Sequence, residues 1–264
     1  MNTTINGSEI CYVHWNPTAY KIGVTVAYCL VFVVSLVGNS SIGKIVYKTK
    51  SLRKPINIFI VSMAMSDLLI PLTHIPVEVA LLYQKLKFGV LGNALCKLIP
   101  ALFNVSFVVS VQSLVLIAVG RFGAVVCPLR SPLINSKLCP LFIVATWIVA
   151  MTSTSLDLFA LSLGKYEGEV RCVWKWEEAF GESISFTDYI LARYIAFLYT
   201  PIIFLILIHS IILIKLKLQK IPGQQSTEAE IQRKNRNKNA LKLAISIVLA
   251  LIVCKLPRTI INVI

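Results

Sequence analysis

The sequence predicts an all-α protein, a multi-pass transmembrane bundle of helices. Of its 264 residues, 56% are hydrophobic and 14% are charged, whereas soluble domains are roughly half apolar and a quarter charged. The mean hydropathy is +0.77. The apolar residues form runs of about 20 residues or more, which cross a bilayer as helices because a helix satisfies its own backbone hydrogen bonds. The six predicted spans are 20–46, 56–82, 97–120, 138–163, 189–214 and 240–264.

The charged residues predict how the chain is oriented in the membrane. Most Lys and Arg residues lie in the loops after the first, third and fifth spans, whereas the alternate loops mix bases with acids. Because basic loops remain on the cytoplasmic side, residues 215–239 are predicted to form a cytoplasmic loop and residues 1–19 an extracellular tail. The net charge of +14 follows this sidedness, so it indicates a lipid bilayer rather than nucleic acid as a partner. We expect a multi-pass protein of the plasma membrane.

The tail carries two candidate glycosylation sites and one of three cysteines expected outside the cell. It shows no short apolar core before a cleavage site, so we expect the first span, rather than a removable signal peptide, to target the chain. Asn2 and Asn6 each begin an Asn-x-Ser/Thr acceptor. Cys96 opens the third span and Cys172 lies in the long outer loop, so a bond between them would tie the loop over the helix end. A bond from Cys11 to one of these two is the alternative.

The sequence contains no recognisable catalytic or metal-binding constellation. Its three histidines, His14, His74 and His209, are scattered, and paired carboxylates, metal-ligand spacing and nucleophile motifs are absent. We therefore predict that the protein is not an enzyme and uses no cofactor. Pro201 and Pro257 lie inside spans, where each permits a helix kink.

A series of motifs follows the same order along the whole chain as in one receptor family. The motifs are Gly38-Asn39, Asn57, the run Ser62 to Leu69, Cys96 with Arg121 25 residues later, Cys127-Pro128-Leu129, Trp147, Pro201 and Cys254-Lys255-Leu256-Pro257. In this order and spacing the chain resembles the rhodopsin-like (class A) G-protein-coupled receptors. The resemblance implies that an extracellular ligand is transduced to a cytoplasmic heterotrimeric G protein.

Only six of the family's seven helices are predicted here. The seventh, with its Asn-Pro-x-x-Tyr motif, is absent, and the sequence stops at Ile264 within an apolar run. We expect a fragment, a truncated gene model or a genuine short form. Two other functions stay open: a six-helix form that does not signal but dimerises with or sequesters a full-length receptor, and an ion-coupled transporter that uses midplane charges.

Asn39, Asp67, Ser110 and Lys255 are expected to form a central polar pocket. Asp67 lies about 11 residues, or roughly 16 Å, into the second span, where a carboxylate is costly and marks a functional site. By resemblance, Asp67 and Ser110 share a sodium site with the seventh helix; a neutral Asp67 bonded to Asn39 is the alternative. Lys255 replaces the family's Trp, so we hypothesise that its ammonium supplies the cation and makes the receptor insensitive to sodium. The alternative is that the Lys255 side chain extends into a water-filled outer vestibule. Sodium sensitivity of ligand binding in a Lys255→Ala variant tests the pairing.

The resemblance also indicates a ligand cavity in the outer halves of the spans, where Glu78, Phe103, Arg193 and Arg258 fall. Phe103 stands where amine receptors carry Asp, so a monoamine ligand is not expected. The acidic and aromatic outer loop favours a peptide, preferably a basic one. The more ordinary explanations are a solvated acidic loop and charges that extend to the membrane interface.

Arg121 ends the third span without the family's usual restraints. The family carries Asp-Arg-Tyr here, but Gly120 replaces the Asp, Phe122 replaces the Tyr, and Asn237 stands where an acid often lies at the foot of the sixth span. By resemblance, Arg121, Gly120, Phe122 and Pro128 face the transducer. The missing acids predict raised basal signalling that Gly120→Asp lowers. The alternative is that Arg121 only marks the cytoplasmic end of a span.

Overall fold

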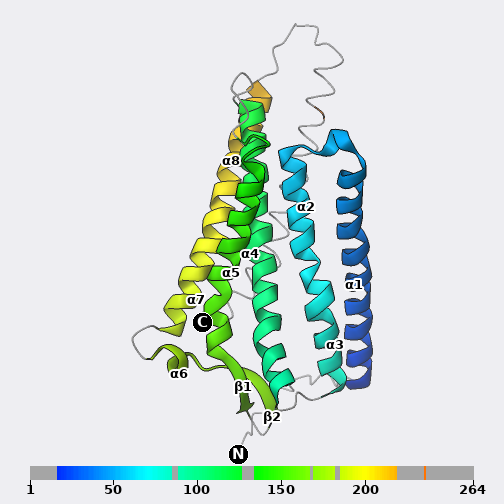
Figure 1. Ribbon diagram of the computed structural model, residues 1–264, viewed down its shortest axis with the longest axis vertical. Coiled ribbons are helices and arrows are strands. Elements are labelled where there is room, and N and C mark those ends of the chain that lie inside the picture. Colours follow the sequence, from blue (N-terminus) through cyan, green and yellow to red (C-terminus); the bar gives the residue numbers. More distant parts are fainter. Residues whose placement is uncertain are drawn as a thin grey trace, which may run out of the picture.

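The computed structural model is a bundle of long helices running side by side, with a β-hairpin at one end (Figure 1). It describes residues 17–84, 89–126, 134–166, 169–181, 185–218 and 235. Within these ranges, five stretches are long and apolar enough to cross a membrane: Thr18–Lys48, Pro55–Tyr83, Val90–Val126, Cys139–Ala160 and Phe186–Lys215. The predicted all-α, multi-pass bundle is confirmed, and the sixth predicted span, 240–264, lies outside the described residues.

The described elements form two groups along the chain. The first group is α1 (Pro17–Lys48), η1 (Lys50–Leu52), α2 (Pro55–Asp67), η2 (Ile70–His74), α3 (Ile75–Tyr83) and α4 (Val90–Val126). The second group is α5 (Cys139–Ala160), β1 (Leu161–Tyr166), β2 (Glu169–Trp174), α6 (Trp176–Phe180), α7 (Phe186–Tyr194), η3 (Ile195–Tyr199) and α8 (Thr200–Leu218).

Two of the spans each contain one widened, π-helical turn. In η2 the N–H of Ile75 bonds to the carbonyl of Ile70, and after η3 the N–H of Thr200 bonds to the carbonyl of Ile195, five residues back in each case. Pro201 follows at once and has no N–H to donate, which interrupts the regular ladder of helical hydrogen bonds. The structure thus places a widened turn directly before Pro201, whereas Pro257 lies outside the described residues.

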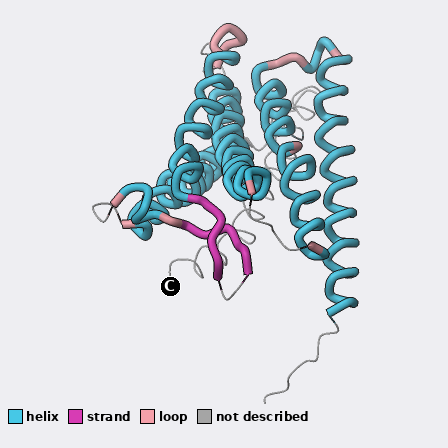
Figure 2. The backbone as a smooth tube through the Cα atoms, turned by 60° about the horizontal axis from the view of Figure 1, so that its bottom comes forward, coloured by secondary structure: helices cyan, strands magenta, loops and turns pink. Residues whose placement is uncertain are grey.

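Helix α4 is the centre of the bundle. It packs against α2, α5, α8 and β1, and it shares one buried apolar cluster with α8 and another with α5. Helix α1, in contrast, lies at the edge (Figure 2). Its Leu30 and Val34 side chains are 62% and 70% exposed, which is the kind of apolar surface that lipid covers in a membrane protein.

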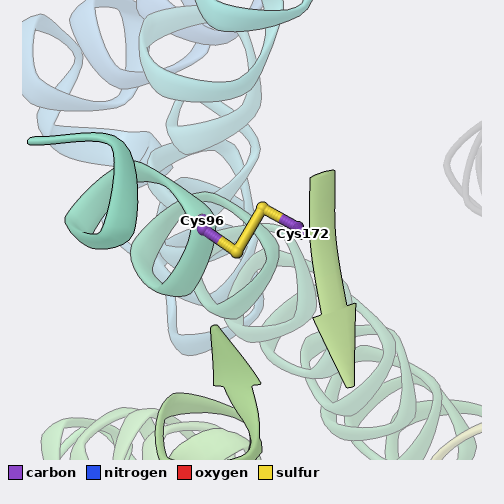
Figure 3. The surroundings of a disulfide bond; sticks show 2 residues. All are labelled: Cys96 and Cys172. Carbon is purple, nitrogen blue, oxygen red and sulfur yellow. A yellow bond between two sulfur atoms is a disulfide. The ribbon is translucent and has the colours of Figure 1, made fainter. Parts of the chain in front are cut away.

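The hairpin is held against the central helix by a disulfide. Strands β1 and β2 pair antiparallel, with Leu163 opposite Cys172. Cys172 is bonded to Cys96 near the start of α4, and their Cα atoms lie 5.5 Å apart (Figure 3). This is the pairing that the sequence predicts, and Cys11 lies outside the described residues. The hairpin therefore marks one end of the bundle, called the hairpin end below.

Two helices differ in extent from the approximate spans that the sequence predicts. The fourth span was expected to reach residue 163, but α5 ends at Ala160 and the apolar run continues into β1, where it pairs with β2 instead of adding a helical turn. The third span was expected over 97–120, but α4 covers Val90–Val126 because its less apolar ends also remain helical. Hydrophobicity alone locates the membrane core of a span and not the ends of its helix.

Candidate functional site

The hairpin end contains a buried ion pair between α5 and α7. Asp157 is 0% exposed, and Nη1 of Arg193 lies 2.9 Å from its Oδ1 and 2.7 Å from its Oδ2. The hydroxyl of Tyr189 donates to Oδ1 at 2.8 Å, and Nδ2 of Asn104 on α4 donates to Oδ2 at 2.8 Å. The carboxylate is therefore hydrogen-bonded by three side chains from two other helices, as a buried charge requires.

This pair changes the expected role of Arg193. The sequence predicts Arg193 in a ligand cavity, but its side chain is only 14% exposed and its charge is matched by Asp157. Removing one member of a buried pair typically costs about 3–5 kcal/mol, because the other charge is left uncompensated. The sequence predicts no pairing of Arg193 with Asp157. Two opposite charges inside different spans were the signal that could have revealed it.

Aromatic rings extend this cluster into the segment after the hairpin. The ring of Tyr189 stacks on Trp176 of α6 with centroids 4.6 Å apart, and the guanidinium of Arg193 lies 5.3 Å from the centroid of Tyr189. Trp176 is 5% exposed and also contacts Phe180 and Phe186, at centroid distances of 4.5 and 5.6 Å. Helix α6 is thereby packed onto α7.

A second group of side chains lies where η2, just before α3, packs against α4. Oε1 of Glu78 is 3.8 Å from Nε2 of His74, and the His74 ring is 5.2 Å from the ring of Phe103. Glu78 and Phe103, both predicted to line the ligand cavity, thus meet around His74. The Glu78 side chain is 37% exposed, so its carboxylate stays accessible. Arg258, the fourth residue predicted there, lies outside the described residues.

The structure brings together two of the four residues of the predicted central pocket. The hydroxyl of Ser110 donates to Oδ1 of Asp67 at 2.6 Å, and the hydroxyls of Ser66 and Ser110 are 3.1 Å apart. Asn39 donates instead to Ser35, one turn back on its own helix, at 3.1 Å. Lys255 lies outside the described residues, so its pairing with Asp67 stays a prediction.

When Asp67 is ionised, the two serine hydroxyls beside it have no hydrogen left to bond to one another. The Ser110 hydrogen goes to Asp67, and the Ser66 hydrogen goes to the carbonyl of Met63 at 2.8 Å. The 3.1 Å contact between the two serine oxygens then has no hydrogen of its own. Among the described residues, the ion pairs involve other acids and not Asp67, and no group of three or more metal-ligating residues is found. The sodium site that the resemblance implies at Asp67 and Ser110 therefore stays a prediction.

At the opposite end of the bundle, Arg121 lies near the end of α4. It is half-buried and interacts with other residues, so it is not an isolated charge. Phe122 packs on the apolar cluster between α4 and α8. A Cβ added to Gly120 would lie 3.1 Å from Cγ1 of Ile56 on α2, so glycine has a packing reason here that the sequence did not reveal. Pro128 lies outside the described residues, as do Asn2 and Asn6.

Trp147 links α5 to α2 near the middle of the bundle. Its Nε1 donates to the hydroxyl of Ser62 at 3.1 Å, and Ser62 is 5% exposed. Both residues belong to the motifs that carried the resemblance. Two marks that are 85 residues apart in the sequence therefore meet in one buried hydrogen bond.

Comparison with known proteins gives one consistent result. The sequence model described as 7 transmembrane receptor (rhodopsin family) matches residues 38–264. The chain is 30% identical over 241 residues to the QRFP-like peptide receptor of Branchiostoma floridae, an alignment covering 90% of this chain and 63% of that receptor. It is 26% identical over 252 residues to the RYamide receptor of Drosophila melanogaster (94% and 54%) and 29% identical over 255 residues to neuropeptide Y receptor type 6 of Mus musculus (90% and 66%).

The chain spans less than two thirds of the length of each of these relatives. They are signalling receptors and not enzymes, in agreement with the sequence prediction. The match begins at residue 38, inside α1, and runs through all the later helices described above to α8. The chain therefore belongs to the rhodopsin family of seven-transmembrane receptors.

Proposed function

We propose that the protein is a peptide receptor of the plasma membrane that transmits ligand binding to a heterotrimeric G protein. The observation that carries this proposal is the family match over residues 38–264 together with relatives named for QRFP-like peptide, RYamide and neuropeptide Y. The hairpin end faces the outside in this proposal, with the N-terminus and its acceptors Asn2 and Asn6. The end that carries Arg121 faces the G protein.

The chemistry of the hairpin end supports a ligand with a cationic group. Glu78 keeps an accessible carboxylate beside His74, whereas the carboxylate of Asp157 is buried and engaged by Arg193. The ring of Phe103 lies 5.2 Å from the ring of His74 and offers an apolar surface without charge. A carboxylate and an aromatic ring on the two sides of His74 suit an Arg or Lys side chain of a peptide, because an aromatic ring adds a cation–π surface to the charge.

A binding experiment on Glu78 tests the ligand part of this proposal. The receptor is expressed from its complete coding sequence and titrated with synthetic peptides of the three kinds named above. Each peptide is paired with a form in which citrulline replaces arginine and removes the positive charge. For a peptide that binds, Glu78→Gln is expected to weaken the arginine form about tenfold, roughly 1.4 kcal/mol, and to leave the citrulline form nearly unchanged. Equal losses for both forms would show that Glu78 does not recognise the charge.

A further inference from the structure

The buried Asp157 connects more elements than an ion pair between two helices needs to. Its carboxylate stands on α5, accepts from Asn104 on α4, and accepts from both Tyr189 and Arg193 on α7. Nη1 of Arg193 also lies 3.2 Å from the Tyr189 hydroxyl. The two α7 side chains therefore hold one another in the orientation that the carboxylate selects, and the hairpin end of α7 is fixed to α4 and α5 together.

The same cluster continues into the segment that follows the hairpin. Tyr189, one turn before Arg193, stacks on Trp176 at an interplanar angle of 23°. Trp176 begins α6, a helix of five residues, which is too short to be stable by itself. The helical form of α6 therefore depends on how Trp176 is packed. A second ring contact, between Trp174 of β2 and Phe186 at 5.0 Å, joins the hairpin to the same end of α7.

The other end of α7 leads directly into the widened turn. η3 begins at Ile195, two residues after Arg193, and α8 beyond it packs on α4 in a separate apolar cluster that includes Leu205 and Ile208. A π-helical turn interrupts the regular ladder, and such turns are often found at functional sites. The orientation of α7 is thus set by the Asp157 cluster, while α8 is held by its own core contacts.

We propose that Asp157 is a positioning residue for ligand recognition: by holding Arg193 and Tyr189, it fixes α7 and α6 as one unit at the hairpin end. Helix α6, at the surface where a ligand would bind, and helix α7, which leads into the bundle, then move together. The reference to a ligand rests on the proposed function, whereas the coupling of α6 to Asp157 does not. A pair that served only the packing of α5 on α7 would leave α6 unaffected.

Hydrogen exchange measured without any ligand tests this coupling. The receptor is purified in lipid nanodiscs, and backbone exchange is followed in segments 174–181 and 186–194. Asp157→Asn, which leaves Arg193 buried without its carboxylate, is expected to speed exchange in both segments about tenfold or more. Asp188→Asn is the matched control, because Asp188 is an exposed acid in the first turn of α7, and it is expected to behave as the wild type.

The double variant Asp157→Asn/Arg193→Gln separates charge pairing from general damage. It leaves no unpaired buried charge, so it is expected to restore most of the protection in both segments. Tyr189→Phe keeps the ring stack and removes one hydrogen bond to the carboxylate, so a smaller acceleration in both segments is expected even where Asp157→Asn fails to fold.

The proposal is overturned when segment 174–181 keeps wild-type exchange in Asp157→Asn, or in Tyr189→Phe if only that variant folds. It is equally overturned when the double variant exchanges as fast as Asp157→Asn. A wild-type receptor that binds none of the peptides would contradict the proposed function and leave this result standing.

Discussion

Gly164 is a position in the hairpin where the structure leaves no room for a side chain. It pairs with Arg171 across the strands, and a Cβ placed on it would lie 2.5 Å from Cγ2 of Val173. Real Cβ atoms do not approach another carbon this closely, so any larger residue displaces Val173 or the strand. The hairpin can form beside the disulfide because this position has no side chain.

Gly164→Ala is expected to destabilise the hairpin by about 1–3 kcal/mol, the usual cost of overpacking. Thermal unfolding of the purified receptor, with hydrogen exchange in segment 161–174, measures the change. The control is Gly164→Ala/Val173→Ala, which removes the methyl group that collides and should recover part of the loss. A Gly164→Ala receptor as stable as the wild type would contradict the close approach.

The contact between Asp157 and Arg193 is a feature that the sequence does not predict. Both are charges inside predicted spans, and the sequence places Arg193 in the ligand cavity. The structure places them 2.7 Å apart because α5 and α7 bring the two positions face to face. Such a pair depends on the rotation of both helices about their axes, and hydropathy gives no information about that rotation.

At the scale of elements, Gly120 sets the distance between α2 and α4. A Cβ there would lie 3.1 and 3.4 Å from Cγ1 and Cδ1 of Ile56, so a side chain requires Ile56 to shift by a few tenths of an ångström. The family's carboxylate is absent from the sequence at this position, and the close helix contact gives a second reason for glycine. Charge and packing therefore make separable predictions.

Basal nucleotide exchange on G proteins distinguishes the effect of charge at position 120 from the effect of packing. We expect basal exchange above that of vector membranes, and we expect Gly120→Asp to lower it because the new carboxylate lies next to Arg121. Gly120→Ala adds the Cβ without the charge and should lower it much less. An equal reduction by both variants would assign the effect to the Ile56 contact, and basal exchange at the vector level would contradict the prediction of raised basal signalling.

The sequence predicted some elements well and others poorly, for physical reasons. The cores of the first five spans followed from apolar runs of the required length, and the Cys96–Cys172 bond followed from the positions of the two residues. The hairpin was missed because Leu161 and Leu163 continue the apolar run of α5. The Trp176 stack was missed because contacts between a loop and a helix leave no periodic pattern.

At the scale of the whole molecule, the two ends of the bundle have different chemistry. The hairpin end combines a disulfide, an accessible carboxylate at Glu78 and a buried pair that orders α7. The other end carries Arg121 beside a close contact of α2 with α4. Helix α4 runs from one end to the other and contacts most of the other spans, so it connects the two proposed sites physically.

A peptide bound at the hairpin end is expected to raise activity at the Arg121 end. The most direct measurement is guanine-nucleotide exchange on heterotrimeric G proteins, in membranes from cells that express the receptor from its complete coding sequence. We predict that a peptide of the QRFP-like, RYamide or neuropeptide Y kind raises exchange above the basal level. A receptor that reaches the cell surface with its Cys96–Cys172 bond intact, yet stays at its basal exchange with every peptide, would contradict this coupling. Exchange that also stays at the vector level would support a form that does not signal.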